Sequence, residues 1–195
     1  TVTFAFSPDG TTLAFIADAP HATREGSQSG RSSPRIWLRR LSDLEPHPLP
    51  GSEGANSLFW SPDARSIGFS AEGRLRRVEA AGGTPVPICD LPYGGPVIGS
   101  WGADAILFAS TFHGVIYRVS PDGGGPPTVL IRCEPERGGT RVVWPCFLPD
   151  GRTFLYVAGR KDGTGELMMA SLDRPPRSIG PITSRVEYFD PGYLV

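Results

Sequence analysis

The stretch Leu58-Phe-Trp-Ser-Pro-Asp-Ala-Arg-Ser-Ile-Gly-Phe69 decides the fold, because its pattern returns four more times along the chain. The aspartates of the five copies are 54, 41, 46 and 40 residues apart, and the mean of about 45 residues is the length of a four-stranded propeller blade. The other copies are Phe4-Ala-Phe-Ser-Pro-Asp-Gly-Thr-Thr-Leu-Ala-Phe15, Gly99-Ser-Trp-Gly-Ala-Asp-Ala-Ile-Leu-Phe108, Pro145-Cys-Phe-Leu-Pro-Asp-Gly-Arg-Thr-Phe-Leu-Tyr156 and the shorter Val186-Glu-Tyr-Phe-Asp-Pro-Gly-Tyr-Leu-Val195.

Each copy has the same physical pattern. An aromatic residue ends a first strand, where its ring is expected to fill the wedge between neighbouring blades: Phe6, Trp60, Trp101 and Phe147. In the turn that follows, proline presets φ, aspartate accepts hydrogen bonds from backbone amides, and glycine takes a positive φ. A strand with alternating apolar residues comes next, and third and fourth strands complete the unit. We therefore expect the aspartates to be turn residues rather than calcium ligands or catalytic groups.

The composition agrees with many short strands separated by tight turns. The chain has 25 glycines and 21 prolines among 195 residues, yet 39% of its residues are hydrophobic and 10% aromatic, too many for a disordered chain. No stretch shows a sustained period of 3.6. The prediction is an all-β propeller of four-stranded antiparallel blades. Four blades are expected at 1–50, 51–90, 91–132 and 133–183, with a partial fifth at 184–195 and an insertion loop at 18–34.

Four blades and the start of a fifth do not close a ring in the usual way. The chain opens on a strand without an initiator methionine, so it looks excised from something longer. We expect a partial ring of a larger propeller, with six blades the favoured number. Its open edges would be free to pair with a neighbouring copy.

Charge and cysteine content exclude several classes. Nineteen basic and 20 acidic residues give a net charge of −1, which shows no footprint for nucleic acid, and no apolar run is long enough to span a membrane. Cys89, Cys133 and Cys146 match no zinc pattern, and the three histidines have no ligand spacing, so no metal and no cofactor are expected. A Cys133–Cys146 disulfide stays open, although three buried thiols are favoured.

The repeats resemble the Trp-Ser-Pro-Asp-Gly repeat of TolB-like propellers. Further segments are similar to one subgroup, the C-terminal propeller of bacterial eukaryotic-like serine/threonine protein kinases: Gly73-Arg-Leu-Arg-Arg-Val, Gly114-Val-Ile-Tyr-Arg-Val, Trp144-Pro-Cys-Phe-Leu-Pro-Asp-Gly-Arg-Thr-Phe-Leu-Tyr156 and Asp190-Pro-Gly-Tyr-Leu-Val195. The resemblance covers the chain apart from residues 18–34. It implies a cytoplasmic kinase domain, one membrane helix and this propeller outside the cytoplasm as a sensor. The third repeat departs from the pattern, because Trp101-Gly-Ala-Asp lacks Ser-Pro and is shorter after the aspartate.

No catalytic motif is found in the chain. It has no His-Arg-Asp loop, no Asp-Phe-Gly and no phosphate-binding glycine loop with its lysine, so kinase activity is not assigned to it. A Gly-x-Ser-x-Gly nucleophile elbow is also absent, and scattered acidic residues form no paired-carboxylate site. The prediction is that this chain is not an enzyme.

Candidate binding residues follow from loop position alone. The connections between second and third strands and those between blades share one end of a propeller: here 18–34, 51–56, 92–96, 111–114 and 133–141. Loops at such an end carry function more often than the strands that support them. The residues there that offer aromatic or charged contacts are Arg24, Tyr93, Phe112, His113, Arg137 and Arg141.

Three functions compete at this stage. The favoured one is an extracytoplasmic sensor that binds a small ligand, a glycan or a protein, as part of a bacterial receptor kinase. The second is a TolB-like scaffold that docks a protein in the periplasm. The third is the gating propeller of a serine peptidase whose catalytic half is missing.

Overall fold

The computed structural model describes residues 3–18, 33–110, 113–134 and 139–183, and the backbone of 188–189 and 193–194. Four four-stranded antiparallel sheets follow one another along the chain, and the described residues contain no helix, so none that could cross a membrane. The predicted all-β propeller is confirmed. The expected insertion loop lies almost wholly outside the described residues.

Each sheet is a meander in which every strand pairs with the next. Blade 1 contains β1 (Phe4–Phe6), β2 (Thr12–Ala17), β3 (Arg35–Arg40) and β4 (His47–Pro48), and blade 2 contains β5 (Ser57–Trp60), β6 (Ser66–Ala71), β7 (Arg74–Glu79) and β8 (Val86–Asp90). Blade 3 contains β9 (Ile98–Trp101), β10 (Ile106–Ala109), β11 (Val115–Val119) and β12 (Thr128–Arg132), and blade 4 contains β13 (Gly139–Phe147), β14 (Thr153–Arg160), β15 (Gly165–Ser171) and β16 (Arg174–Ile182). A two-stranded hairpin of β17 (Tyr188–Phe189) and β18 (Tyr193–Leu194) follows.

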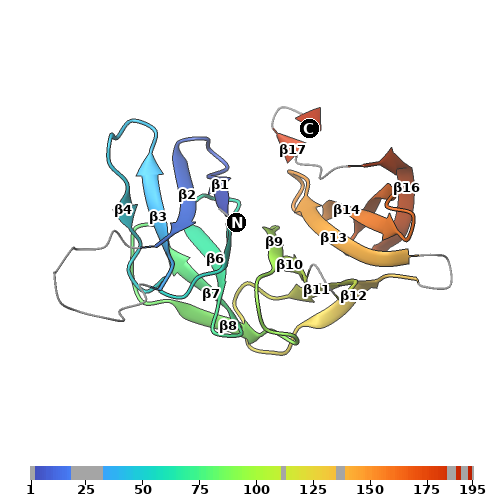
Figure 1. Cartoon of the computed structure of the whole chain (residues 1–195), viewed down its shortest axis with the longest axis horizontal. Coiled ribbons are helices and arrows are strands. Elements are labelled where there is room, and N and C mark those ends of the chain that lie inside the picture. The colour runs from blue at the N-terminus through green and yellow to red at the C-terminus, as the bar shows by residue number, and fades with distance from the viewer. Residues whose placement is uncertain are drawn as a thin grey trace.

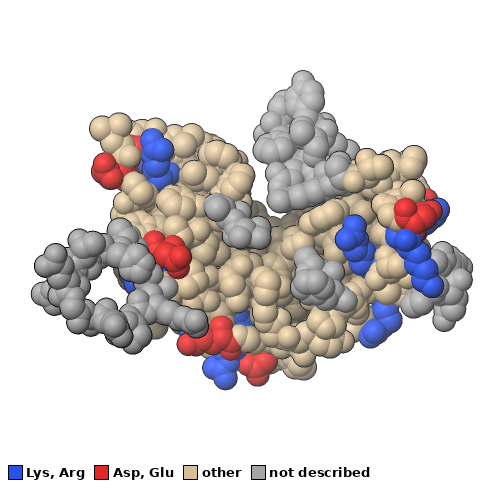
Figure 2. Space-filling view, viewed as in Figure 1, with Lys and Arg blue, Asp and Glu red and all other residues tan. Residues whose placement is uncertain are grey.

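The blades form an arc that does not close. The first strands lie innermost, where β5 contacts β1 and β9, and β9 contacts β13. Figure 1 shows blades 1 to 4 arranged in order around this inner side, with an opening between blade 1 and blade 4. Figure 2 shows the same opening in the molecular surface. The predicted partial ring is confirmed, whereas a total of six blades stays a prediction.

Apolar side chains between successive blades make the core. Trp60, at the end of β5, is only 8% exposed and packs among blade 1 and blade 2 residues, and its indole Nε1 donates a hydrogen bond to the carbonyl oxygen of Ala5 at 3.1 Å. Phe147 fills the same place between blades 3 and 4 at 9% exposure. For Phe6 the expected wedge is wrong: this ring is 51% exposed because no blade of the described residues lies against it.

One core contact between blades 2 and 3 depends on two glycines. The ring of Phe59 on β5 lies against Gly68 of its own blade and Gly99 of the next blade. A Cβ atom added at Gly68 or Gly99 would lie 2.4 Å or 2.1 Å from a ring carbon of Phe59. Only glycine therefore leaves room for this ring at either position.

The repeated turns have the geometry that the sequence predicts. Asp9, Asp63 and Asp150 accept hydrogen bonds from backbone amides two residues later, at 3.0, 3.1 and 2.9 Å. The pKa of Asp63 is lowered by the Ser61 hydroxyl first and by the Arg65 amide next. Gly10 and Gly151 have φ of 69° and 64°, and Ala64 takes the same left-handed conformation at 58° in place of glycine.

Each blade has two distinct ends. At the connection end, the link to the next blade bonds to the loop between second and third strands: Gly54 N to Pro34 O, Leu91 N to Gly73 O and Cys133 N to Gly114 O, each at 2.8 Å. At the turn end, the aspartate turns lie beside the connection between third and fourth strands: Leu41 N to Thr11 O, Ala80 N to Arg65 O and Leu172 N to Arg152 O. The described parts of the predicted binding loops therefore lie at the connection end.

The three cysteines are free. Cys89 is buried, and burial raises the pKa of its thiol to about 11. Cys133 and Cys146 are only partly buried, so the expectation of three buried thiols is wrong for these two. The Cys133–Cys146 disulfide that the sequence left open is not formed.

Candidate functional site

Three of the six nominated residues can be placed. Tyr93, His113 and Arg141 are described, whereas Arg24, Phe112 and Arg137 lie outside the described residues. Tyr93 belongs to the link between blades 2 and 3, and His113 to the loop between β10 and β11. Arg141 lies near the start of β13 in blade 4. The structure brings the first two together and leaves Arg141 apart from them.

Tyr93 and His113 form a parallel stack at the connection end. Their ring centroids are 3.6 Å apart and their planes differ by only 3°. Tyr93 is 52% exposed, and His113 is also exposed. The loop beside β10 thus holds one aromatic side chain against the link between blades and presents both to solvent.

Residues of blade 3 lie next to both rings of the stack. His113 Nδ1 is 2.8 Å from the hydroxyl of Ser110, a buried residue directly after β10. Tyr93 and Tyr117 of β11 line the same small recess, and the Tyr117 ring is stacked on Phe108 at 5.3 Å. The pKa of Tyr117 is raised by burial first and by Tyr93 next. Tyr93 is stacked on His113, which Ser110 holds, and this ordering reduces the entropy that a partner would have to overcome.

The surface around this stack is shallow. A recess beside it, between Leu91, Pro92, Val97 and Tyr117, has a volume of about 10 Å³. That is at most the space of one water molecule, so no small ligand can be enclosed there. An exposed, rigid tyrosine on a shallow surface instead suits contact with another macromolecule, where tyrosine is enriched among the residues that dominate affinity.

Arg141 makes a separate arrangement in blade 4. Its guanidinium carbon lies 5.8 Å from the ring centroid of Trp144, and its side chain packs over Gly159. Trp144 has a left-handed φ of 56° within a bulge of β13. Bulges and strained residues are common near functional sites, and this one interrupts the pairing of β13 with β14.

Sequence reasoning missed Ser110 and Tyr117. Tyr117 occupies the register position that Arg76 occupies in blade 2, opposite Phe108 as Arg76 is opposite Phe69. A tyrosine where the preceding repeat has an arginine is the signal that was available.

The described residues contain no group of three histidine, cysteine or acidic side chains that could hold a metal ion.

The fold and its two ends define the chain as an open β-propeller. Comparison with solved structures shows which propellers this architecture resembles. The structure is similar to TolB from Acinetobacter baumannii, with a TM-score of 0.70 and 16% identity over 98% of this chain and 47% of that one. It is also similar to a putative TolB from Agrobacterium tumefaciens, with a TM-score of 0.67 and 19% identity over 98% of this chain and 66% of that one. The chain thus has the TolB-like propeller fold.

A third neighbour is the β-propeller domain of the Trilobed protease from Pyrococcus furiosus, described as having an open velcro topology. It matches with a TM-score of 0.59 and 16% identity over 96% of this chain and 62% of that one. The chain therefore spans about half to two thirds of the length of these three proteins. No protein-family model and no curated sequence matches it.

Proposed function

We propose that this chain is part of a non-enzymatic, extracytoplasmic propeller that docks a protein or peptide at its connection end, centred on Tyr93 and His113. The observation that carries the proposal is the Tyr93–His113 stack: a half-exposed tyrosine lies parallel against a histidine that Ser110 holds. The recess of about 10 Å³ beside it favours a protein surface over a small ligand or glycan.

The distribution of charge supports a partner without strong net charge. On the face shown in Figure 2, lysine, arginine and acidic side chains gather along the outer rim of the blades, and the middle of the arc is largely uncharged. The net charge of −1 agrees with this pattern. Such a surface gives little electrostatic steering, so recognition rests on shape and aromatic contact.

In the context of the kinase resemblance, this docking makes the propeller the sensor of a bacterial receptor serine/threonine kinase. The partner then has to bind one receptor state more tightly than the other, because equal affinity for both shifts nothing. A second candidate is favoured by the similarity to two TolB structures: a periplasmic scaffold that docks a protein without a kinase.

The coding sequence on either side distinguishes these contexts. An upstream kinase domain followed by a membrane helix supports the receptor. Their absence supports the scaffold, and a downstream α/β-hydrolase domain supports the peptidase propeller instead. All three contexts are compatible with docking at the connection end.

The docking surface itself is tested with a peptide selected against the wild-type chain from a phage-displayed random library. Titration of the synthetic peptide into Tyr93→Ala should show a loss of affinity of about tenfold or more, as for an aromatic contact at the centre of an interface. Leu44→Ala is the matched control, because Leu44 is 88% exposed but lies in the turn between β3 and β4 at the turn end. Equal affinity of wild type and Tyr93→Ala would contradict the proposal.

A further inference from the structure

Among the described repeats, Asp104 is the aspartate that accepts no hydrogen bond from the backbone of its own turn. In the other three described repeats, the aspartate accepts a hydrogen bond from a backbone amide of the turn. Asp104 makes no hydrogen bond and no ion pair within the described part of the chain, and its turn is closed by Gly102 N donating to Ala105 O at 2.8 Å. This is the repeat in which Gly-Ala replaces Ser-Pro. Its carboxylate is therefore exposed and without a partner among those residues.

Arg118 is unpaired for an equally specific reason. It holds the register position of Arg77, since Arg77 is opposite Gly68 in blade 2 and Arg118 is opposite Leu107 in blade 3. Arg77 forms an ion pair of 3.4 Å with Asp122, in the turn end of the next blade. The corresponding residue of blade 4 is Asp173, which lies 3.6 Å from Arg152 instead. Among the described residues, the Arg118 guanidinium has no acidic neighbour within ion-pair distance.

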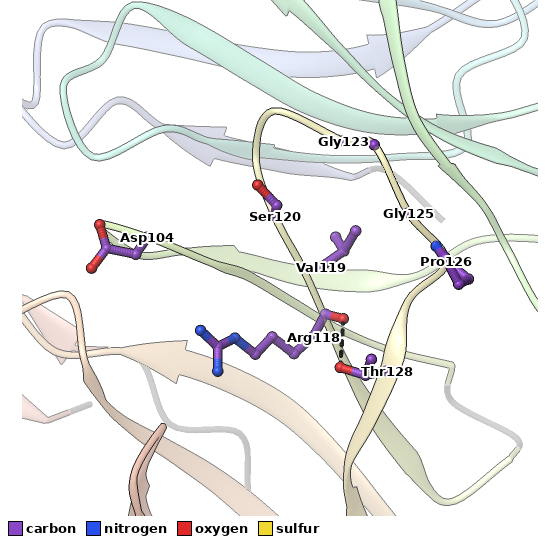
Figure 3. A pocket seen from close by; sticks show the side chains of 9 residues that line it. Asp104, Arg118, Val119, Ser120, Gly123, Gly125, Pro126 and Thr128 are labelled. Atoms are coloured by element: carbon purple, nitrogen blue, oxygen red, sulfur yellow. Dashed lines mark hydrogen bonds between the residues drawn. The ribbon is translucent and has the colours of Figure 1, made fainter.

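These two unpaired charges line the same cavity. Figure 3 shows Asp104 and Arg118 at the turn end of blade 3, beside the loop that joins β11 to β12. The cavity is widely open to solvent and has a volume of about 380 Å³, enough to seat a small molecule. Glycines 123–125 form part of its wall and add no side chains that would fill it.

Two hydroxyl groups add hydrogen-bonding capacity. Ser120 Oγ accepts a bond from the Asp122 amide at 3.3 Å, so its own proton is free to be donated. Thr128 Oγ1 donates to the carbonyl oxygen of Arg118 at 3.3 Å, so its lone pairs are free to accept. Both residues line the cavity, which therefore offers a cation, an anion, a donor and an acceptor.

We propose that this cavity binds a small zwitterion, a free α-amino acid, with its carboxylate on Arg118 and its ammonium group on Asp104. A simple anion would satisfy Arg118 but would meet the carboxylate of Asp104, and a simple cation would meet the opposite conflict. A ligand that carries both charges satisfies both residues. A guanidinium group pairs with a carboxylate through two parallel hydrogen bonds, which also fixes the orientation of the ligand.

Calorimetric titration of the whole chain with L-alanine tests this site, with propionate and ethylamine as probes that each lack one of the two charged groups. Saturable binding of L-alanine is expected, with affinity about tenfold or more above that of either probe. Arg118→Gln and Asp104→Asn should each weaken L-alanine binding by a similar factor. Arg74→Gln is the matched control, since Arg74 is an exposed arginine of β7 that does not line the cavity.

Three results would overturn the zwitterion site. They are no saturable binding of L-alanine up to about 10 mM, propionate binding as tightly as L-alanine, and an equal loss in Arg74→Gln. Because neither Asp104 nor Arg118 makes an ion pair in the described residues, both variants should keep the wild-type melting temperature, which confirms that they fold. The site is at the turn end, so its failure leaves the docking surface around Tyr93 untouched.

Discussion

The faces of blade 1 and blade 2 that are turned toward a preceding blade carry the same pattern in the same register. In blade 2, Leu58 is opposite Phe69 and Trp60 is opposite Ile67, and these strand-end residues are 7% and 8% exposed. In blade 1, Phe4 is opposite Phe15 and Phe6 is opposite Leu13, yet Phe4 and Phe6 are 60% and 51% exposed. Both faces carry large apolar side chains at equivalent positions, but within the described part of the chain a preceding blade lies only against the face of blade 2.

This difference separates what a repeat encodes from what its neighbour supplies. The alternation along β1 and β2 directs Ala5 and Ala14 toward blade 2 and the larger rings to the opposite side. Each blade therefore presents an apolar face encoded by its own repeat, and this face becomes buried only when a neighbouring blade packs against it. The exposed face of blade 1 is an inter-blade interface without its partner in the described structure.

The largest expected effect is the difference in unfolding free energy between two truncations: that of a buried ring in blade 2 and that of its partly exposed counterpart in blade 1. Phe69→Ala removes a fully buried ring from the core between blades 1 and 2, and should lower the free energy of unfolding by about 3–5 kcal/mol. Phe15→Ala removes the equivalent, partly exposed ring of blade 1 and should lower it by about 1 kcal/mol. Urea unfolding of both variants measures the difference, and equal losses would contradict the comparison.

The contact between blades 2 and 3 provides the next test. Gly99→Ala places a Cβ 2.1 Å from the Phe59 ring and should destabilise the fold by about 1–3 kcal/mol through overpacking. Gly125→Ala is the control, since nothing lies within 4 Å of a Cβ there. An unchanged urea midpoint for Gly99→Ala would show that Phe59 is not confined between the blades.

Acid stability tests the turns that both blades share. The Ser61 hydroxyl and the Arg65 amide hold the pKa of Asp63 below its usual 3.8, so the carboxylate stabilises the fold above that pH and loses this effect as the pH falls through its folded pKa. Below about pH 4, wild-type stability should fall more steeply than that of Asp63→Asn. Melting temperatures from pH 7 to pH 2.5 measure this, and parallel curves would contradict it.

The smallest expected effect exchanges residues between equivalent turns. Ala64 has a left-handed φ of 58°, so Ala64→Gly should raise the free energy of unfolding by about 0.5–1 kcal/mol. Gly10→Ala, at φ 69° in open space, should lower it by a similar amount of about 0.5–1 kcal/mol. Changes of the same sign in the two variants would show that backbone strain does not govern these turns.

The sequence predicted the repeat, its turns and the partial ring, because each of these depends on residues close together in one copy. It predicted a wedge at Phe6 wrongly, since burial of that ring requires a blade that no local pattern can supply. The Tyr93–His113 stack was not predictable as a pair, because twenty positions separate the residues and the two loops meet only when β8 and β10 are in place. The unpaired Asp104 had a visible signal, the loss of Ser-Pro in its repeat, but its cavity with Arg118 depends on the fold.

Hydroxyl-radical footprinting with mass spectrometry tests the open face of blade 1 most directly, because it compares side chains of one type. Phe4 and Phe6 should be oxidised several-fold faster than Phe69, Phe108 and Phe154, which are at most 1% exposed. Rates for Phe4 and Phe6 as low as those of the three buried rings would show that another blade covers this face, and would contradict the open ring.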